Sequence, residues 1–294
     1  MRQKSHVTEL QAIKTITGLL VLPKPGIVAL VLVSCMTGLY IGGRGMPDSE
    51  VVFWVMLGLG TATAGATTLN NFVDRDIDGI MHRTRMRSIP SGSVSARRAF
   101  LIGTVFVTVS LIILKITVGN LVTLLTGLAV FIYVILYTIF FKRLTPFATH
   151  IGGVAGAMPP LIGYAASTGS LDVNAFILFM IIVVWQQPHF WVLALKYRED
   201  YAKAGIPILP VARGVRATKV KMFWYTLALF PITAIPYFIG IVGVNYLAAA
   251  VVMNFAYLSL TIRFLLSPKD KNMFLFFFSI AYLGVIFCAM IIDL

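Results

Sequence analysis

The sequence predicts an all-α membrane protein with nine transmembrane helices around a central cavity. The chain is 59% hydrophobic with a mean hydropathy of +0.90, and only 12% of its residues are charged. Soluble domains carry about twice that share of charge. Nine apolar runs approach the roughly 20 residues that a helix needs to cross a bilayer. None alternates as a barrel strand does, so helices must satisfy the backbone in lipid.

The predicted spans follow one another along a single domain, residues 1–294. They cover residues 26–43, 51–72, 99–118, 121–141, 150–168, 174–195, 222–240, 246–266 and 273–292. Only Gly119 and Asn120 separate the third span from the fourth, which predicts a tight helical hairpin. Small residues are dense in the second and fifth spans. They favour close helix packing, with room for a bulky ligand as the alternative.

The distribution of Lys and Arg predicts the orientation. Of the 24 such residues, all except Arg44 and Lys115 fall on the side of the N-terminal segment. Positive loops stay inside, so we expect the N-terminus in the cytoplasm and the C-terminus outside. Topology thus accounts for the net charge of +13 without a nucleic-acid partner, and the lipid bilayer is the expected environment. The polar loops 72–98 and 196–221 would then form a cytoplasmic cap.

The first polar segment, residues 70–87, follows the second predicted span and carries a stripe of oxygen ligands. Its members are Asn70, Asp74 and Asp78. Residues four positions apart are rotated by only about 40° around a helix, so the three side chains share one face. Such oxygens suit Mg²⁺, which takes one or two carboxylates and leaves other positions to water and phosphates. Arg83 and Arg87 could grip the same phosphates. The alternative is a solvated loop, but ionisable groups reaching into an apolar helix end favour a site.

The second polar segment, residues 185–203, follows the sixth predicted span. If that helix continues through the loop, four residues fall within about 60° of arc, with Gln186 beside them. The four are His189, Lys196, Asp200 and Lys203. The two lysines could hold a diphosphate, and the aspartate could share the metal or orient the lysines. For the histidine, a hydrogen-bonded packing role is the alternative. The later cations of this loop could instead contact lipid headgroups.

These motifs resemble those of a known family. The pattern Asn-x-x-x-Asp-x-x-x-Asp after the second span resembles the first motif of the UbiA superfamily of intramembrane prenyltransferases. That superfamily usually has an aspartate-rich second motif, but this chain has Trp-Gln-Gln-Pro-His-Phe-Trp and Lys-Tyr-Arg-Glu-Asp-Tyr there. With Lys24-Pro25, Ala-Gly-Ile-Pro-Ile-Leu-Pro and Gly-Ala-Met-Pro-Pro-Leu-Ile-Gly-Tyr, these motifs resemble the branch that farnesylates protohaem IX. The likeness covers nearly the whole chain.

The resemblance implies a function. Farnesyl diphosphate and haem B would be the substrates, and the farnesyl group would join the haem 2-vinyl group with addition of water, giving haem O for terminal oxidases. It implies Mg²⁺ on Asn70, Asp74 and Asp78, with Lys196 and Asp200 also catalytic. Substrate would be bound by Arg83, Arg87, Lys203, Gln186, His189 and Tyr197. The missing second aspartate motif implies that lysines do part of the diphosphate work. The setting would be a bacterial or archaeal cell membrane with a cytoplasmic active site, and haem A synthase or oxidase assembly components could be partners.

Other functions are compatible with parts of the sequence. A prenyltransferase acting on a quinone precursor or chlorophyllide would share the first motif but not the Gln-Gln-Pro-His-Phe segment. A transporter would have broken helices with charges at mid-depth. Here the acids gather at one membrane face, which disfavours transport. A non-catalytic haem or assembly factor is a further alternative.

Overall fold

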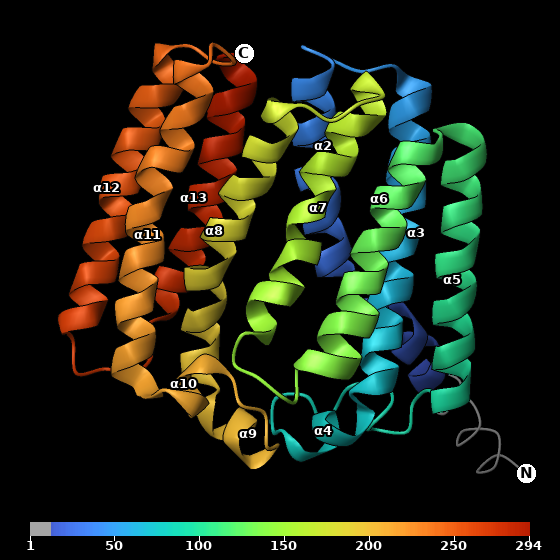
Figure 1. The fold of residues 1–294 in the computed structure, drawn as a ribbon. Helices are drawn as coiled ribbons and strands as arrows, with labels where there is room; N and C mark the ends of the chain where they lie inside the picture. Colours follow the sequence, from blue (N-terminus) through green and yellow to red (C-terminus); the bar gives the residue numbers. More distant parts are fainter. Residues whose placement is uncertain (1–12) are drawn as a thin grey trace, which may run out of the picture.

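The computed structural model describes residues 13–294, and their regular elements are all helical. The long elements are α2 (Pro25–Gly42), α3 (Ser49–Val73), α5 (Ala96–Thr117), α6 (Asn120–Val130) with η1 (Phe131–Phe141), α7 (Ala148–Thr168), α8 (Val173–Lys196), α11 (Gly214–Phe238), α12 (Val244–Leu266) and α13 (Met273–Ile292). The short ones are α4 (Arg75–Ile80), α9 (Arg198–Lys203) and α10 (Leu209–Ala212). Figure 1 shows the long helices side by side, with the short helices at one end of the bundle and the C-terminus at the other.

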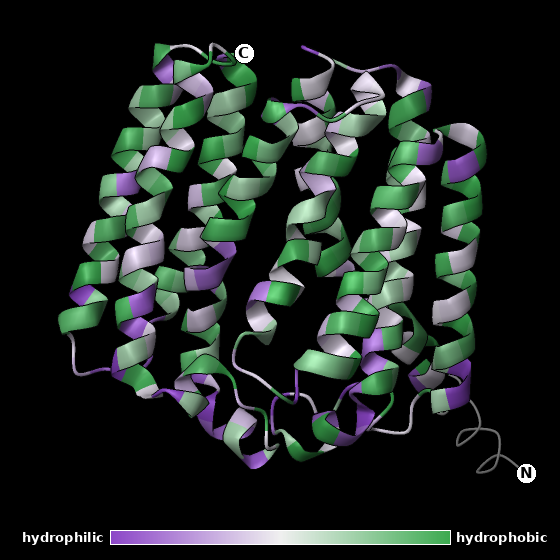
Figure 2. Cartoon of the chain, viewed as in Figure 1, coloured by the Kyte–Doolittle hydropathy of each residue, from purple (hydrophilic) through white to green (hydrophobic). Residues whose placement is uncertain are grey.

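The all-α prediction is confirmed for the described residues. Seven segments there are long and apolar enough to cross a membrane. The helices α7 and α11, of 21 and 25 residues, run beside them but are less apolar. Helix α11 begins at Gly214, eight residues before the predicted start at residue 222. The prediction counted apolar residues only, and the first turns of this helix are polar. Figure 2 shows hydrophilic residues gathered at the end with α4, α9 and α10.

Four of the long helices begin at a residue whose side chain caps the first turn. They are Asp48 before α3, Ser95 before α5, Asp172 before α8 and Asn272 before α13. Each side-chain oxygen accepts a hydrogen bond from a backbone N–H that has no partner within the helix. The caps therefore fix where these apolar helices start.

Helices α2 and α7 pack almost backbone to backbone. A Cβ atom on Gly38 would lie 1.9 Å from the Pro160 carbonyl oxygen, and one on Gly163 would lie 2.0 Å from the Cys35 carbonyl oxygen. At Gly65 of α3, a Cβ would lie 2.8 Å from a carbonyl oxygen of α5. Small residues allow such approaches in membrane bundles, where packing rather than water exclusion drives association. The packing interpretation of the small residues is thus confirmed at these positions.

Helix α6 continues directly into η1, a π-helix of 11 residues that the sequence did not predict. In a π-helix each N–H bonds five residues back, which widens the turn. The Lys142 N–H donates to the Tyr137 carbonyl at 2.8 Å in this way. The rings of Tyr133 and Tyr137 stack with centroids 5.8 Å apart. These three side chains face the same cavity, so the wide turn shapes the candidate site.

The supposition that the sixth span continues through the following loop holds only in part. Helix α8 ends at Lys196 and α9 begins at Arg198, and the Tyr197 N–H donates to Leu193 and the Tyr201 N–H to Tyr197, both at 3.1 Å, but Tyr197 has φ −107° and ψ 24°, which bends the chain between the two helices. The bend at Tyr197 lets Tyr201 pack against Ile77 and Met81 of the first polar segment. Burial of these apolar groups favours the bend over a straight helix. His189 therefore does not share one continuous stripe with the residues of α9.

Candidate active site

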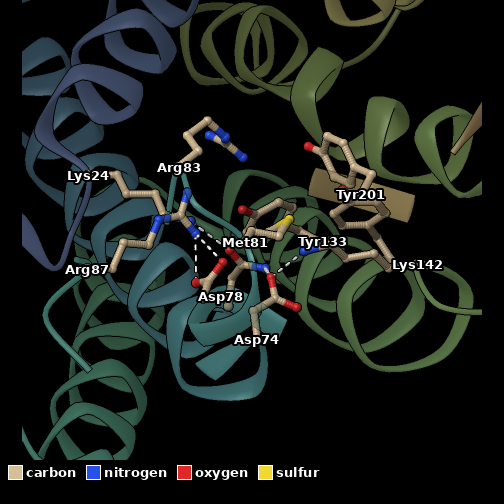
Figure 3. Close-up of a pocket in the computed structure, with 11 residues that line it drawn as sticks. Lys24, Asp74, Asp78, Met81, Arg83, Arg87, Tyr133, Lys142 and Tyr201 are labelled. Atoms are coloured by element: carbon tan, nitrogen blue, oxygen red, sulfur yellow. Dashed lines mark hydrogen bonds and ion pairs between the residues drawn. The ribbon is translucent and has the colours of Figure 1, made fainter. Parts of the chain in front are cut away.

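A polar cavity of about 120 Å³ lies where α3, α4 and η1 meet the turn before α2. Figure 3 shows Asp74 and Asp78 between Lys24 and Arg87 on one side and Lys142 on the other. The lining residues are Lys24, Asn70, Asp74, Asp78, Met81, Arg83, Arg87, Tyr133, Tyr137, Lys142 and Tyr201. The cavity is thus built from segments far apart in the sequence.

The acidic stripe of the first polar segment is assembled as the spacing predicts. Helix α3 ends at Val73, but the i to i+4 ladder persists, because the Asp74 N–H donates to Asn70 at 2.9 Å and the Asp78 N–H donates to Asp74 at 2.8 Å. All three side chains are buried, Asp74 completely. The Asn70 Nδ2 donates to Asp74 Oδ2 at 2.7 Å and to Thr138 Oγ1 at 3.1 Å. The stripe is therefore one connected polar unit.

Cations pair with every member of this stripe. Arg87 donates to both carboxylate oxygens of Asp78, at 3.0 and 2.8 Å. Lys142 donates to Asp74 Oδ2 at 2.5 Å, and Lys24 donates to Asn70 Oδ1 at 2.6 Å. Each of these bonds joins a charged donor to an oxygen acceptor, the stronger class of hydrogen bond. The stripe is thus paired with Arg87 of its own segment and with Lys24 and Lys142 from two others.

The Lys142 ammonium is stabilised in its charged form. Burial opposes the charge, but nearby Tyr137 and the hydrogen-bonded Asp74 raise the pKa of Lys142 above its ordinary value. The side chain is only 12% exposed. A permanent positive charge therefore lies against the acidic stripe.

Lys24 is held in place by an unusual turn. Its backbone has φ 52° and ψ 65°, in the left-handed region that residues other than glycine rarely adopt. Helix α3 fixes this turn from both sides. Thr67 Oγ1 donates to the Pro23 carbonyl at 2.7 Å, and Asn71 Nδ2 donates to the Leu22 carbonyl at 2.8 Å. Strain that the surrounding structure holds in this way is typical of functional positions.

One oxygen of the stripe has no partner. Asp74 Oδ1 is buried and makes no hydrogen bond within the described structure. Leaving a charged oxygen bare is costly, and a bound cation would remove the cost. Together with the Asn70 and Asp78 oxygens, it gives the hard donor set that Mg²⁺ prefers. The residues present therefore fit a divalent cation.

The second polar segment supplies one side chain to the cavity, that of Tyr201. The six residues predicted there, namely Gln186, His189, Lys196, Tyr197, Asp200 and Lys203, lie outside the lining. Asp200 accepts a hydrogen bond from the Arg83 backbone N–H at 3.2 Å. The Tyr197 ring lies 5.1 Å from the Arg83 guanidinium and 5.2 Å from the Lys196 ammonium. This segment therefore contacts the first through Arg83.

The polar residues within α8 point to different neighbours. Gln186 donates to the Gly153 carbonyl of α7 at 2.6 Å. His189 faces α13 instead, with its ring stacked 4.7 Å from both Trp185 and Phe276 and its Nδ1 2.6 Å from Ser279 Oγ. Lys203 is exposed on α9. The structure thus separates the members of the predicted stripe.

The sequence did not assign six of the cavity residues to a site. They are Lys24, Met81, Tyr133, Tyr137, Lys142 and Tyr201. Lys24 entered only as part of a motif, and Lys142 only as a topology charge. One signal in the sequence could have indicated some of them. Two tyrosines four residues apart lie at the end of the fourth predicted span, and a lysine follows on the same membrane face as the acids.

Residues 31–284 match the UbiA prenyltransferase family. The chain belongs to the UbiA prenyltransferase family. It is 53% identical to the protohaem IX farnesyltransferase of Aquifex aeolicus over 94% of both chains. It is 39% identical to the enzyme of that name from Symbiobacterium thermophilum, over 97% of this chain and 96% of the relative. With its apolar helices, this UbiA family member is an integral membrane protein.

Solved structures of UbiA proteins share the fold. A digeranylgeranylglyceryl phosphate synthase superposes with a TM-score of 0.79 at 17% identity, covering 95% of this chain and 98% of that one. A UbiA homologue from Archaeoglobus fulgidus, bound to DMAPP and Mg²⁺, gives 0.66 at 19% identity, covering 94% and 99%. The helical architecture of this UbiA family member is therefore one that occurs in known prenyl-diphosphate proteins.

Proposed function

We propose that this chain transfers the farnesyl group of farnesyl diphosphate to the 2-vinyl group of haem B, with addition of water, to give haem O for terminal oxidases. The observation that carries the proposal is the 53% identity with the Aquifex aeolicus protohaem IX farnesyltransferase over 94% of both chains. The cationic cavity beside an acidic stripe supports it, because a diphosphate needs both positive charge and a metal.

The orientation is part of the proposal. Nine spans, including α7 and α11, would place the N-terminus in the cytoplasm and the C-terminus outside. The polar loops 72–98 and 196–221 would cap a cytoplasmic active site. The excess of Lys and Arg on one side of the sequence supports this topology. The acids, arginines and lysines of the cavity then lie at the face where a soluble diphosphate arrives, within one domain.

The diphosphate would lie in the cavity. Asn70, Asp74 and Asp78 would hold Mg²⁺, which supplies Lewis-acid stabilisation of the leaving group when bound. Arg83 and Arg87 would bind the diphosphate oxygens. Arg87 is already fixed by its hydrogen bonds to Asp78, so it would stabilise the charge that develops on the leaving group with little reorganisation.

Ionisation would break the bond between farnesyl C1 and the bridging oxygen, with the electron pair leaving on the diphosphate. The vinyl π electrons of haem B attack C1, and water adds to the resulting cation with loss of a proton. The stacked rings of Tyr133 and Tyr137 line the cavity, and their faces would stabilise the allylic cation. Apolar walls must keep other water away from that cation.

The haem would be bound through the second polar segment, by Gln186, His189 and Tyr197. The Ser279 hydroxyl donates its proton to the Phe276 carbonyl oxygen at 2.6 Å, so this proton is not available to His189. His189 Nδ1 must then donate to Ser279, which leaves Nε2 free to accept or to ligate iron. At the junction with the cavity, Asp200 and Lys196 would position Arg83 and Tyr197, and the exposed Lys203 would guide the incoming diphosphate.

One experiment tests the proposed function. Purified protein in detergent is incubated with haem B, farnesyl diphosphate and Mg²⁺, and the haem fraction is separated by reversed-phase chromatography. We expect a more hydrophobic haem whose mass equals that of haem B plus farnesyl plus the elements of water. An unchanged haem, together with prenylation of 4-hydroxybenzoate in a parallel reaction, would instead identify an enzyme acting on quinone precursors.

A further inference from the structure

We propose that the cavity binds farnesyl diphosphate with a single divalent cation, and that Lys24 and Lys142 supply the positive charge of a second. This inference rests on the proposed function, since it concerns how the same diphosphate is held. It goes further by fixing the metal stoichiometry and by assigning a substrate-binding role to two residues that the sequence did not place in the site.

The charge balance of the cavity favours one cation. Its lining has four basic side chains, Lys24, Arg83, Arg87 and Lys142, and two carboxylates, which gives a net charge of +2 when all six are ionised, as a bound anion would favour. A prenyl diphosphate carries about three negative charges at neutral pH. One divalent cation would leave the filled site at about +1, whereas two would leave about +3. An uncompensated charge of that size is expensive to bury.

The oxygen atoms that remain without a partner in the cavity also favour a single divalent cation. Arg87 occupies both carboxylate oxygens of Asp78, and Lys142 and Asn70 occupy Asp74 Oδ2. Lys24 occupies the carbonyl oxygen of the Asn70 amide. Among the carboxylate oxygens lining the cavity, Asp74 Oδ1 is the one without a partner. A single cation can bind there, beside the Asn70 and Asp78 oxygens that line the same cavity, and take its remaining ligands from water and the diphosphate.

Both lysines are placed by backbone features rather than by flexible loops. Lys24 lies in the left-handed turn that Thr67 and Asn71 hold against α3. Lys142 ends the π-helix, whose last N–H bond positions it over Asp74. Asp200, the acid of the second polar segment nearest the cavity, is engaged with the Arg83 backbone instead of the cavity. The fold therefore brings two lysines to the stripe, while the acid of the second polar segment contacts the Arg83 backbone.

The metal count tests the proposal directly. The wild-type protein is titrated with Mn²⁺ in the presence of saturating farnesyl thiolodiphosphate, a slowly ionising analogue. Free Mn²⁺ is measured from its electron paramagnetic resonance signal. We expect one Mn²⁺ bound per chain. Two bound ions, or none while the analogue binds, would overturn the inference.

Two variants test the lysines. Lys24→Met and Lys142→Met should each weaken binding of farnesyl thiolodiphosphate by about tenfold or more in calorimetric titrations at fixed Mn²⁺. The matched control is Arg143→Met, which removes a neighbouring cation that pairs with Asp76 on the surface. Its affinity should equal that of the wild type. Unchanged affinity in both folded lysine variants would overturn the assignment, and the wild-type metal count decides the inference if neither variant folds.

These measurements contain no haem, so they are independent of the acceptor. One Mn²⁺ per chain and weakened lysine variants, without any farnesylated haem in the turnover assay, would refute the proposed acceptor and leave this inference standing. Haem farnesylation with two Mn²⁺ bound per chain would support the proposed function and refute the inference of a single cation.

Discussion

The two polar segments of this chain follow similar apolar helices but are organised differently. In the first, Asn70, Asp74 and Asp78 stay on one helical ladder and form one buried hydrogen-bonded unit. In the second, the chain bends at Tyr197, and its polar residues contact α7, α13 and the Arg83 loop. The first segment is therefore one connected polar unit, whereas the second links several parts of the molecule. Variants in the two segments should differ accordingly.

The largest effect is expected at Asp74. Asp74→Asn keeps the shape of the side chain and an oxygen for Lys142 but removes the charge that would hold the metal. We expect the rate of haem farnesylation to fall by about 10²–10³-fold, the range seen when one preorganised electrostatic contact is lost. Thermal unfolding in detergent should stay close to that of the wild type. A variant with near-normal turnover would show that the stripe is structural.

A smaller effect is expected at His189, on the acceptor rather than the diphosphate. If His189 ligates the haem iron, His189→Ala should shift the Soret band of bound haem B and weaken haem binding by about tenfold. Added imidazole should restore part of the spectrum. Affinity for farnesyl thiolodiphosphate should not change. An unaltered Soret band would assign His189 to packing between α8 and α13.

At Asp200 we expect an indirect effect. Asp200→Ala removes the acceptor for the Arg83 N–H, so the loop that carries Arg83 loses an anchor. KM for farnesyl diphosphate should rise by about three- to tenfold with little change in kcat, since a hydrogen bond to a charged group contributes about 1.5–3 kcal/mol at most. The neighbouring exposed acid provides the control, Glu199→Ala. A fall in kcat as large as that of the Asp74 variant would place Asp200 in the reaction itself.

The smallest effect is expected at Asp76, which points away from the stripe. Its hydrogen bond with Arg143 lowers the pKa of Asp76 to about 2. A depressed pKa stabilises the fold above the unfolded value of about 3.9, and this contribution is lost as the pH falls through about 2. The carboxylate is exposed, so screening limits the contribution to about 0.5 kcal/mol. Asp76→Asn should lower stability slightly at pH 6, match the wild type near pH 2, and leave turnover unchanged. Lost turnover would contradict the separation of Asp76 from the site.

The sequence was sufficient for the helices and for the acidic stripe. Apolar runs of spanning length indicate helices whatever their packing, and the i to i+4 spacing places Asn70, Asp74 and Asp78 together without knowledge of any other helix. The same argument failed for the second polar segment because Gln186 and His189 contact different helices and because Tyr197 bends the chain before α9.

The cations of the site could not be predicted in this way. Lys24 and Lys142 pair with residues 46 and 68 positions away, so only the tertiary packing brings them to the stripe. Both also depend on backbone conformations that leave no periodic signal, a left-handed residue in one case and a π-helix in the other. A lysine at the end of an apolar run looks the same whether it faces lipid headgroups or a buried acid.

The π-helix makes this part of the chain sensitive to length as well as to composition. A substitution between Phe131 and Phe141 changes one side chain, but removal of a single residue would let the segment close into an ordinary α-helix. Because the two helix types differ in their turn per residue, the residues after the deletion would change their rotation about the helix axis, which would disturb the pairing of Lys142 with Asp74. One-residue deletions in this stretch should therefore be far less tolerated in a mutational scan than conservative exchanges, whereas loops at the opposite end of the bundle should accept both.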